Sequence, residues 1–167
     1  MSLLPIRRFP DPLLTQPTRP VERIDAPVAR LIDGLIRTMR HHPRCVGLAA
    51  PQVGSPLRIA VMDASVHPKA PAGTHGLLVL VNPRLAGIEG GGIQREGCLS
   101  IPDFTANVRR AAAVTLKAWD ERGSSYELRL EGFEAIIAQH EVDHLDGRLF
   151  LDRVANLATD VFKRKAY

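Results

Sequence analysis

Apolar residues recur at helical spacing in the segment that follows Asp25. One face of this segment carries Val28, Leu31, Ile32, Leu35, Ile36 and Met39. Asp25 just before the segment and Pro27 at its start are typical of a helix N-terminus. The pattern therefore predicts an amphipathic helix that begins at Asp25 and ends near His41-His42-Pro43.

A second helical pattern begins after Gly132. Its regularly spaced positions are apolar at first and then become imidazoles, in the order Phe133, Ile136, Ile137, His140 and His144. Gly147 suits the end of this helix because glycine readily adopts the conformation of a helix C-terminus. A further short helix is predicted over residues 154–163.

Short apolar runs with β-branched residues alternate with turn-forming segments. Strands are predicted over residues 58–63 and 77–82, separated by a loop that contains proline and glycine. Residues 114–119 and 126–130 flank Asp120-Glu121-Arg122-Gly123 and predict a hairpin. Separate strands and hairpins around a central helix indicate an α+β fold with antiparallel or mixed strands, rather than a doubly wound sheet.

The composition changes this picture little. A length of 167 residues fits one catalytic domain over residues 1–167. The chain has two cysteines, Cys45 and Cys98, which is too few for a disulfide framework. No apolar run approaches the roughly 18 residues of a membrane helix. We therefore expect a cytoplasmic protein. The net charge of +4 is spread along the chain, apart from Arg109-Arg110 and Lys163-Arg164-Lys165. A solvated surface without a nucleic-acid motif is favoured, and weak attraction to the ribosome stays open.

The segment His140-Glu141-Val142-Asp143-His144 carries the chemistry of the chain. Histidines four residues apart lie on one helix face, about 6 Å apart along the axis, where two imidazoles can bind one metal ion. The glutamate between them can exchange protons with water at that ion. This is the outline of a metallohydrolase whose third ligand has to come from elsewhere.

The sequence after His144 lacks the ligand that other HExxH enzymes place there. In the pattern HExxHxxGxxH a third histidine follows, but this chain has Gly147 and then Phe150. A second protease group uses a downstream glutamate, and none occurs after Glu141. The remaining formal candidates fit poorly: they are Asp146, Asp152 and Asp160 downstream, and His41, His42, His67 and His75 upstream in a predicted helix end or loop.

Cys98 is the better candidate for the third ligand. It lies in Glu96-Gly97-Cys98-Leu99-Ser100, predicted as a turn in which glycine lets backbone amides approach a site closely. A thiolate is a strong ligand for zinc or ferrous iron, and coordination keeps it deprotonated. A buried apolar cysteine is the alternative interpretation, which the incomplete two-histidine site weakens.

Three segments, in this order, resemble the peptide deformylase family. They are Val46-Gly47-Leu48-Ala49-Ala50-Pro51-Gln52, Glu96-Gly97-Cys98-Leu99-Ser100 and Gln139-His140-Glu141-Val142-Asp143-His144-Leu145-Asp146-Gly147. Phe9-Pro10-Asp11-Pro12-Leu13 and Val81-Asn82-Pro83 are also similar, so the likeness spans about residues 8–152. The resemblance implies a bacterial hydrolase that removes the formyl group from the N-formylmethionine of newly made polypeptides. These formylated polypeptides would be its partners.

The resemblance also implies a metal. The ligands would be Cys98, His140 and His144. One divalent ion would be bound, with ferrous iron expected and zinc, nickel or cobalt as substitutes. Affinity alone does not select iron, because the Irving–Williams order places it low.

The remaining site residues follow from the same resemblance. Glu141 would carry protons, while the Gln52 side-chain amide and the Leu99 N–H would stabilise the oxyanion. Substrate binding would involve Val46, Gly47, Phe133, Ile136 and Ile137. Main-chain recognition would use strand-like pairing with the peptide.

One position departs from the family pattern. Cys45 stands two residues before Gly47, where the family commonly has glycine, and we expect retained activity with a second thiol near the metal and sensitivity to oxidation. Two other functions stay open. The chain could be a zinc endopeptidase that uses the same HExxH, or a catalytically silent deformylase-like protein that binds metal or formyl peptides.

Overall fold

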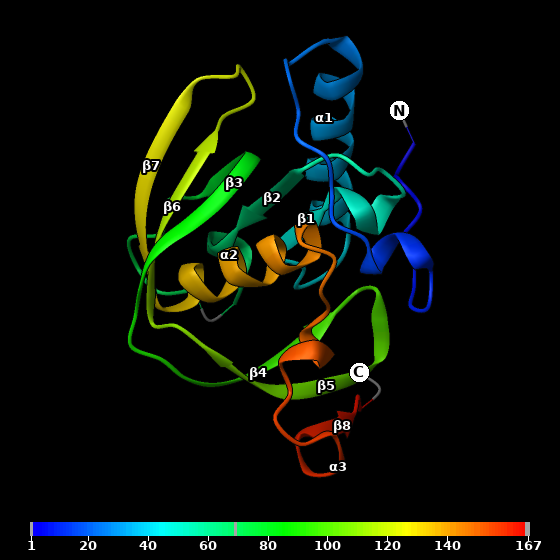
Figure 1. Ribbon diagram of the computed structural model, residues 1–167, viewed down its shortest axis with the longest axis vertical. Coiled ribbons are helices and arrows are strands. Elements are labelled where there is room, and N and C mark those ends of the chain that lie inside the picture. The colour runs from blue at the N-terminus through cyan, green and yellow to red at the C-terminus, as the bar shows by residue number, and fades with distance from the viewer. Residues whose placement is uncertain (1, 69, 166–167) are drawn as a thin grey trace.

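The computed structural model describes residues 2–68 and 70–165 (Figure 1). Its helices are α1 (Ala26–His41), α2 (Gly132–Leu145) and α3 (Leu157–Asp160). Its strands are β1 (Gly47–Ala49), β2 (Ile59–Asp63), β3 (Leu77–Glu89), β4 (Gly92–Cys98), β5 (Ile101–Arg110), β6 (Ala113–Trp119), β7 (Ser125–Glu131) and β8 (Val161–Lys163). Short 3-10 helices span Pro12–Thr15, Ala50–Val53, Ala64–Val66 and Phe150–Arg153. None of the helices in this part of the chain is both long enough and apolar enough to cross a bilayer.

The strands form two antiparallel sheets, and α2 lies between them (Figure 1). The larger sheet has the order β1-β2-β3-β6-β7, and the smaller has the order β4-β5-β8. This arrangement confirms the predicted α+β class. It also places the helix with the two histidines where both sheets can contribute side chains to its surroundings.

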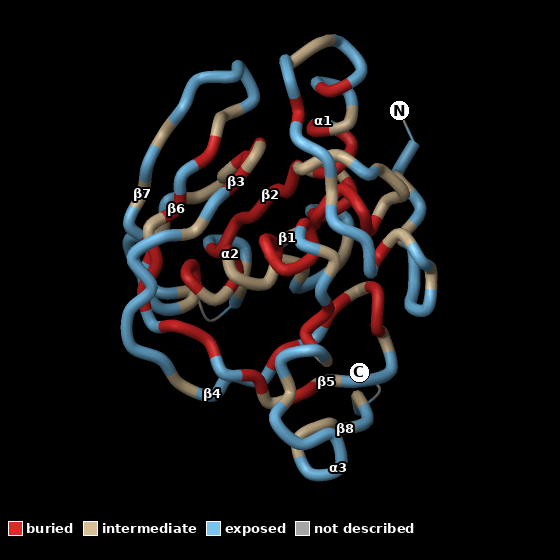
Figure 2. The backbone as a smooth tube through the Cα atoms, viewed as in Figure 1, coloured by how far each residue is buried: buried red, intermediate tan, exposed pale blue. Residues whose placement is uncertain are grey.

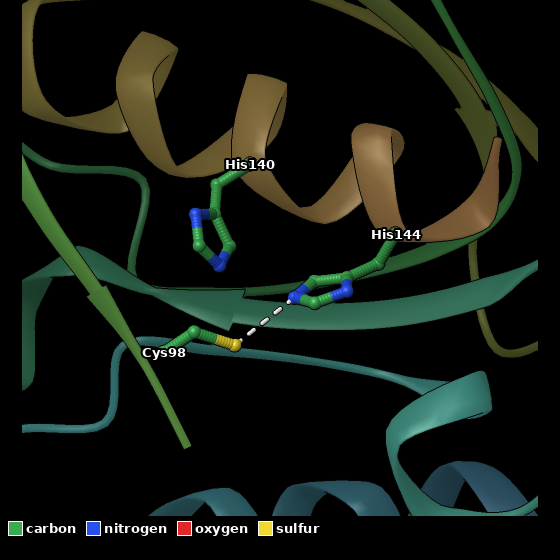
Figure 3. A group of neighbouring side chains, drawn as sticks. All are labelled: Cys98, His140 and His144. Carbon is green, nitrogen blue, oxygen red and sulfur yellow. Dashed lines mark hydrogen bonds between the residues drawn. The ribbon is translucent and has the colours of Figure 1, made fainter. Parts of the chain in front are cut away.

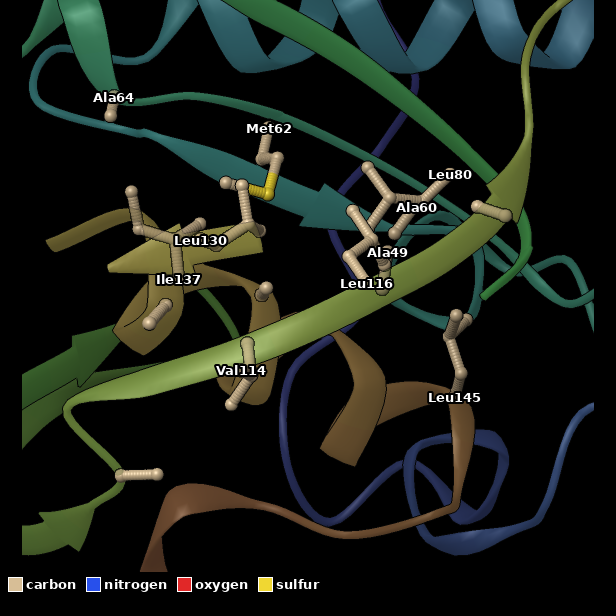
Figure 4. Packing of buried hydrophobic residues seen from close by; sticks show 14 residues of the cluster. Ala49, Ala60, Met62, Ala64, Leu80, Val114, Leu116, Leu130, Ile137 and Leu145 are labelled. Carbon is tan, nitrogen blue, oxygen red and sulfur yellow. The ribbon is translucent and has the colours of Figure 1, made fainter. Parts of the chain in front are cut away.

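Both faces of the larger sheet are covered at β2. Ile59 and Val61 pack in the same cluster as the buried face of α1. Ala60 and Met62 belong to the cluster that includes Ile137 of α2 (Figure 4). Every residue of β2 is therefore buried, which is visible in Figure 2 and explains why residues 59–62 are continuously apolar instead of alternating.

The first helix was predicted correctly. The Asp25 side chain accepts a hydrogen bond from the Val28 N–H at 3.0 Å, so it caps a helix that ends at His41. The predicted apolar face is buried at Val28, Ile32, Leu35 and Met39. Hydrophobic spacing and capping chemistry agree here, and each is a local signal.

The predicted strands are present, although β3 is longer than expected. It continues from Leu77 through Pro83 to Glu89, and its pairing with β6 shifts register on either side of the paired segment 84–86. The predicted hairpin is β6 and β7, in full register from Ala113↔Glu131 to Trp119↔Ser125. Turn residues therefore identified this hairpin, whereas the bulged continuation of β3 gave no clear periodic signal.

The short helix predicted over residues 154–163 is present, but the predicted bounds were too wide. Only Leu157–Asp160 is helical, and the chain then forms β8, where Phe162 pairs with Thr105 of β5. The free edge of β5 offers hydrogen-bond partners that an isolated terminal helix lacks, and a β-branched and an aromatic residue suit a strand. Strands β1, β4 and β5 were not predicted, since β4 contains glycines and charged residues in place of apolar alternation.

Candidate metal centre

The side chains of Cys98, His140 and His144 converge on one point. Each offers one ligand atom, and these atoms lie within 4.8 Å of one another. The two imidazoles project from α2 toward Cys98, whose Sγ lies 3.3 Å from His144 Nε2 (Figure 3). The structure therefore brings together the three residues proposed as ligands from sequence.

Cys98 reaches this point from the last position of a strand, and not from the turn that the sequence predicted. It ends β4, with Leu99 and Ser100 forming the turn and Ile101 beginning β5. The β4–β5 register shifts between Gly97 and Cys98. This register shift lies directly beside Cys98, and such an irregularity in strand pairing can redirect a side chain, here the Cys98 thiol toward α2.

The charges of the three groups support one another. Burial opposes ionisation of the Cys98 thiol, but the rings of His144 and His140 lower its pKa well below the usual value. Burial also opposes protonation of His140, whereas hydrogen bonds to Cys98 and Glu96 raise its pKa well above the usual value. A thiolate beside an imidazolium is the result, and a metal ion replaces the proton in such a pair.

The donor set fits a divalent transition metal. One thiolate and two imidazoles are ligands that zinc and ferrous iron accept, and three protein ligands leave a position open for chemistry. Glu141 is buried beside them, and its Oε2 has no hydrogen-bond partner within the described residues. A buried carboxylate oxygen without a partner is costly, so its presence beside the three donors indicates a site shaped for a ligand.

Burial controls the protonation of Glu141. Removal of the carboxyl group from water raises its pKa to about 7, although the neighbouring His140 and His144 lower it. A carboxyl group with a pKa near neutral can both accept and release a proton at physiological pH. The residue is therefore suited to moving protons in this site.

Position 47 requires glycine because the Glu141 side chain occupies the space that a larger residue would need. A Cβ built on Gly47 would collide with the Oε1 and the carboxyl carbon of Glu141. The sequence analysis assigned this glycine to substrate binding, whereas in the structure the missing side chain makes room for the Glu141 carboxylate.

Gln52 is fixed in one orientation. Its Oε1 accepts a hydrogen bond from the Ala49 N–H at 2.9 Å, which turns its Nε2 toward the site. This Nε2 donates to Cys98 Sγ at 3.3 Å and to Ser100 Oγ at 3.1 Å. The amide nitrogen therefore lies next to the three donor atoms, and an oxygen atom placed there would take the place of one of these two acceptors.

A chain of buried ion pairs orients His140. Its Nδ1 lies 2.8 Å from Glu96 Oε2, and Arg110 binds both oxygens of Glu96, at 2.6 and 2.9 Å. Arg110 also donates to Asp143 at 2.6 Å, and Arg153 donates to both oxygens of Asp143, at 2.6 and 3.1 Å. The contacts link β4, β5 and α2, so the position of the His140 ring depends on both the smaller sheet and the helix.

Sequence reasoning missed this network. Arg109-Arg110 was interpreted as solvated surface charge, which is wrong for Arg110 because only 4% of it is exposed. Burial by itself raises the pKa of Glu96, but the hydrogen bonds to Arg110 and His140 lower this pKa to about 2. The available signal was the position of Asp143 inside the HExxH segment together with Glu96 two residues before Cys98.

The residues predicted to bind substrate line one cleft of about 630 Å³. They are Val46, Gly47, Phe133, Ile136 and Ile137, and the same cleft is lined by Gln52, Cys98, Leu99, His140 and Glu141. His67 also lines it, with its ring 5.1 Å from that of Phe133. The cleft thus has an apolar region over the first half of α2 and a polar region at the donor atoms.

Cys45 lines the same cleft but has a different character from Cys98. Its Sγ donates to the carbonyl oxygen of Gly47 at 3.1 Å. Burial, with a smaller contribution from Glu141, raises the pKa of the Cys45 thiol to about 12. Since the thiolate is the reactive form, the expected sensitivity to oxidation at Cys45 is weakened by its surroundings.

Comparison with known proteins gives a consistent result. Residues 3–160 match the family model described as polypeptide deformylase. The chain is 41% identical to a peptide deformylase from Syntrophobacter fumaroxidans over 165 residues, which cover 99% of this chain and 94% of the relative. A peptide deformylase structure from Thermotoga maritima superposes with a TM-score of 0.84 at 36% identity, covering 93% of this chain and all of that one. A Met-Ala-Ser-bound class I type b peptide deformylase from Acinetobacter baumannii gives 0.85 at 34% identity, covering 92% of this chain and 99% of that one.

Proposed function

Because this chain belongs to the polypeptide deformylase family, we propose that Cys98, His140 and His144 bind the divalent metal on which its activity depends. The chain is a metallohydrolase that removes the formyl group from the N-terminus of newly made polypeptides and releases formate. The convergence of the three donor atoms beside the unpartnered Glu141 carboxylate is the observation that supports the proposal. We also propose that residues 1–167 act as one catalytic domain.

In the proposed mechanism, each polar residue of the cleft has a separate task. Cys98, His140 and His144 would hold a divalent ion, and this ion would supply Lewis acidity for lowering the pKa of water toward about 7 and for polarising a carbonyl. Glu141 accepts a proton from the attacking water and delivers a proton to the departing amine. The Gln52 amide and the Leu99 N–H donate hydrogen bonds to the formyl oxygen as it gains negative charge.

Substrate selection follows from the shape of the cleft. The methionine side chain packs on Phe133, Ile136 and Ile137, next to Val46 and Gly47. β1 and β4 are each the edge strand of a sheet and both contribute to the cleft, so an extended peptide can pair with them as an additional strand. The Acinetobacter baumannii relative has been solved with Met-Ala-Ser bound, which supports a short peptide as the kind of ligand that this cleft accepts.

We propose ferrous iron as the physiological metal. Mixed sulfur and nitrogen donors accept iron, zinc, nickel and cobalt. Which of these metals is the physiological one therefore depends on the metal supply and on the rate of formate release by the enzyme loaded with each metal. Anaerobic purification followed by metal analysis and reloading with each ion tests this choice. Iron is supported if it is the main metal recovered and gives the highest rate of formate release.

We further propose that the protein meets nascent chains in the cytoplasm and associates weakly with the ribosome through its net charge of +4. Cosedimentation with ribosomes at increasing salt tests the association. Binding that persists at high salt would contradict a purely electrostatic contact, because salt screens such attraction.

The decisive experiment measures formate release from formyl-Met-Ala-Ser under anaerobic conditions, with the metal content determined in parallel. Glu141→Gln is expected to keep its metal and to lose about 10²–10⁴-fold in kcat, the usual contribution of a general acid–base. Cys98→Ala is expected to lose the metal as well. Full metal content in Cys98→Ala would contradict the ligand assignment and direct attention to Cys45.

The same assay separates the other functions. Cleavage of unformylated Met-Ala-Ser would indicate an endopeptidase. Full metal content without formate release would indicate a binding protein that is catalytically silent.

A further inference from the structure

The C-terminal strand contributes to the wall of the substrate cleft. Arg164 directly follows β8, and its N–H donates to the Asp103 carbonyl oxygen at 2.7 Å. Its side chain lines the same cleft as Cys98 and Glu141. A residue far from the catalytic motifs in sequence therefore lies beside the place where the substrate binds.

The Arg164 guanidinium lies over Gly97 of β4. A Cβ built on Gly97 would collide with Arg164 Nη2 and would come within 3.3 Å of Thr105 Cγ2. Arg164 Nε is buried and has no hydrogen-bond partner within the described residues. The side chain is thus inserted against the strand while part of its hydrogen-bonding capacity is unused.

Arg95 lies on the same face of the strand. It is two residues before Gly97, and residues two apart in a strand point to the same side. Its guanidinium carbon lies 3.5 Å from the ring centroid of Phe162 in β8, and its Nη1 donates to Thr105 Oγ1 at 3.4 Å. The terminal strand therefore holds two arginines, Arg95 and Arg164, along one side of the cleft.

Among the residues that the structure describes, neither arginine is neutralised by a neighbouring acid. Within residues 2–68 and 70–165, no carboxylate forms an ion pair with Arg95 or Arg164, although Arg110 on the inner side of this sheet pairs with two. Two guanidinium groups without a counter-charge, at the wall of a peptide-binding cleft, favour a carboxylate ligand, because the fork of donors matches its two oxygens.

The pairing of the peptide with β4 decides which residue of the peptide lies next to Arg95 and Arg164. Alternate side chains of an extended peptide point to opposite faces of the sheet that it joins. The methionine side chain points toward Phe133 and Ile137 of α2, which is the side of β4 that carries Glu96 and Cys98. The next residue then points to the opposite face, where Arg95 and Arg164 lie.

We propose that Arg164 and Arg95 form a subsite for an acidic side chain, aspartate or glutamate, at the residue immediately after formylmethionine. The inference rests on the proposed function and adds a preference among its substrates. A terminal carboxylate of a short peptide has the same chemistry, and amidated peptides distinguish the two sources.

The test compares kcat/KM for formate release from amidated peptides. Formyl-Met-Asp-Ser-amide is expected to exceed its neutral isostere formyl-Met-Asn-Ser-amide by about fivefold at low salt, in the range of a partly exposed ion pair. High salt should reduce this ratio. Formyl-Met-Ala-Asp-amide, whose acid lies one residue later, should show a smaller gain over formyl-Met-Ala-Asn-amide.

Variants assign the preference to the two arginines. Arg164→Gln and Arg95→Gln should lower the Asp/Asn ratio toward one, chiefly by lowering kcat/KM for the Asp peptide. Lys163→Gln is the matched control, because it removes the same charge from an exposed position one residue earlier and should keep the ratio. Arg164→Lys keeps the charge, is conservative for folding and should retain part of the ratio.

The outcomes are distinct. An Asp/Asn ratio near one in the wild type, or a ratio unchanged in both Gln variants, overturns the subsite. A preference for the free acid of formyl-Met-Ala-Ser over its amide, without a preference for Asp, assigns the arginines to a terminal carboxylate and overturns the side-chain subsite. No formate from any peptide overturns the proposed function instead.

Discussion

Gly47 and Glu141 form a complementary pair, in which one residue has no side chain so that the other can occupy the site. The collision that a Cβ would cause involves the carboxylate itself, next to the metal ligands. At the residue scale, the requirement for glycine is therefore steric and catalytic. Local backbone conformation does not impose it, since Gly47 is absent from the residues with positive φ.

Gly47→Ala is expected to displace the Glu141 carboxylate and to reduce kcat for formate release by about 10²-fold or more, since an acid–base group then loses its position. Metal content should be unchanged. Gly92→Ala is the matched control, because the nearest atom to its added Cβ is 3.8 Å away. Equal activity of the two variants would contradict the steric argument.

The Cys45 thiol should react slowly with alkylating agents at neutral pH. Its pKa is raised to about 12, so the protonated thiol dominates until strongly alkaline pH and the reactive thiolate fraction increases only as pH rises toward that value. Iodoacetamide labelling followed by peptide mass spectrometry measures the rate. Labelling of the native protein at pH 7.5 as fast as in urea would refute this expectation.

At the scale of elements, the buried ion pairs join α2 to the smaller sheet. Arg110 of β5 lies between Glu96 of β4 and Asp143 of α2, so one cation compensates two buried anions. Its removal leaves Glu96 without its guanidinium partner and leaves Asp143 with Arg153 alone, in a low-dielectric environment. The network therefore fixes both the packing of the helix and the orientation of His140.

Arg110→Met is expected to lower the free energy of unfolding by about 3–5 kcal/mol, as for other broken buried ion pairs. Metal affinity should fall by about 10- to 100-fold, because the partner that orients His140 is disturbed. Urea denaturation and metal competition titrations measure the two effects. Arg109→Met, on the same strand but exposed, should change both by little, and similar losses in both variants would argue against a role for the network.

At the scale of the whole molecule, the proposed metal links parts of the chain that are otherwise held by packing. Cys98 belongs to the smaller sheet, whereas His140 and His144 belong to the helix that packs on the larger sheet. A ligand that binds only the native arrangement stabilises it by mass action. Metal binding should therefore stabilise the fold as well as support hydrolysis.

Removal of the metal by a chelator should lower the melting temperature by about 10 °C, if the free ion had been near 1,000 times its Kd. Reloading with zinc or nickel should restore it. Calorimetry measures both steps, with Cys98→Ala as the control that should show no dependence on metal. A metal-dependent shift of the same size in that variant would show that another group binds the ion.

The sequence by itself determined the elements whose signals are local: the capped helix after Asp25, the β6–β7 hairpin and the HExxH helix. It also pointed to Cys98, because the two-histidine site lacked a ligand downstream. Only the tertiary structure decided the identity of β4, β5 and β8, the burial of Arg110 and the insertion of Arg164 into the cleft. These features depend on pairing and charge compensation between segments distant in the chain, and hydrophobic periodicity within one segment carries no information about such partners.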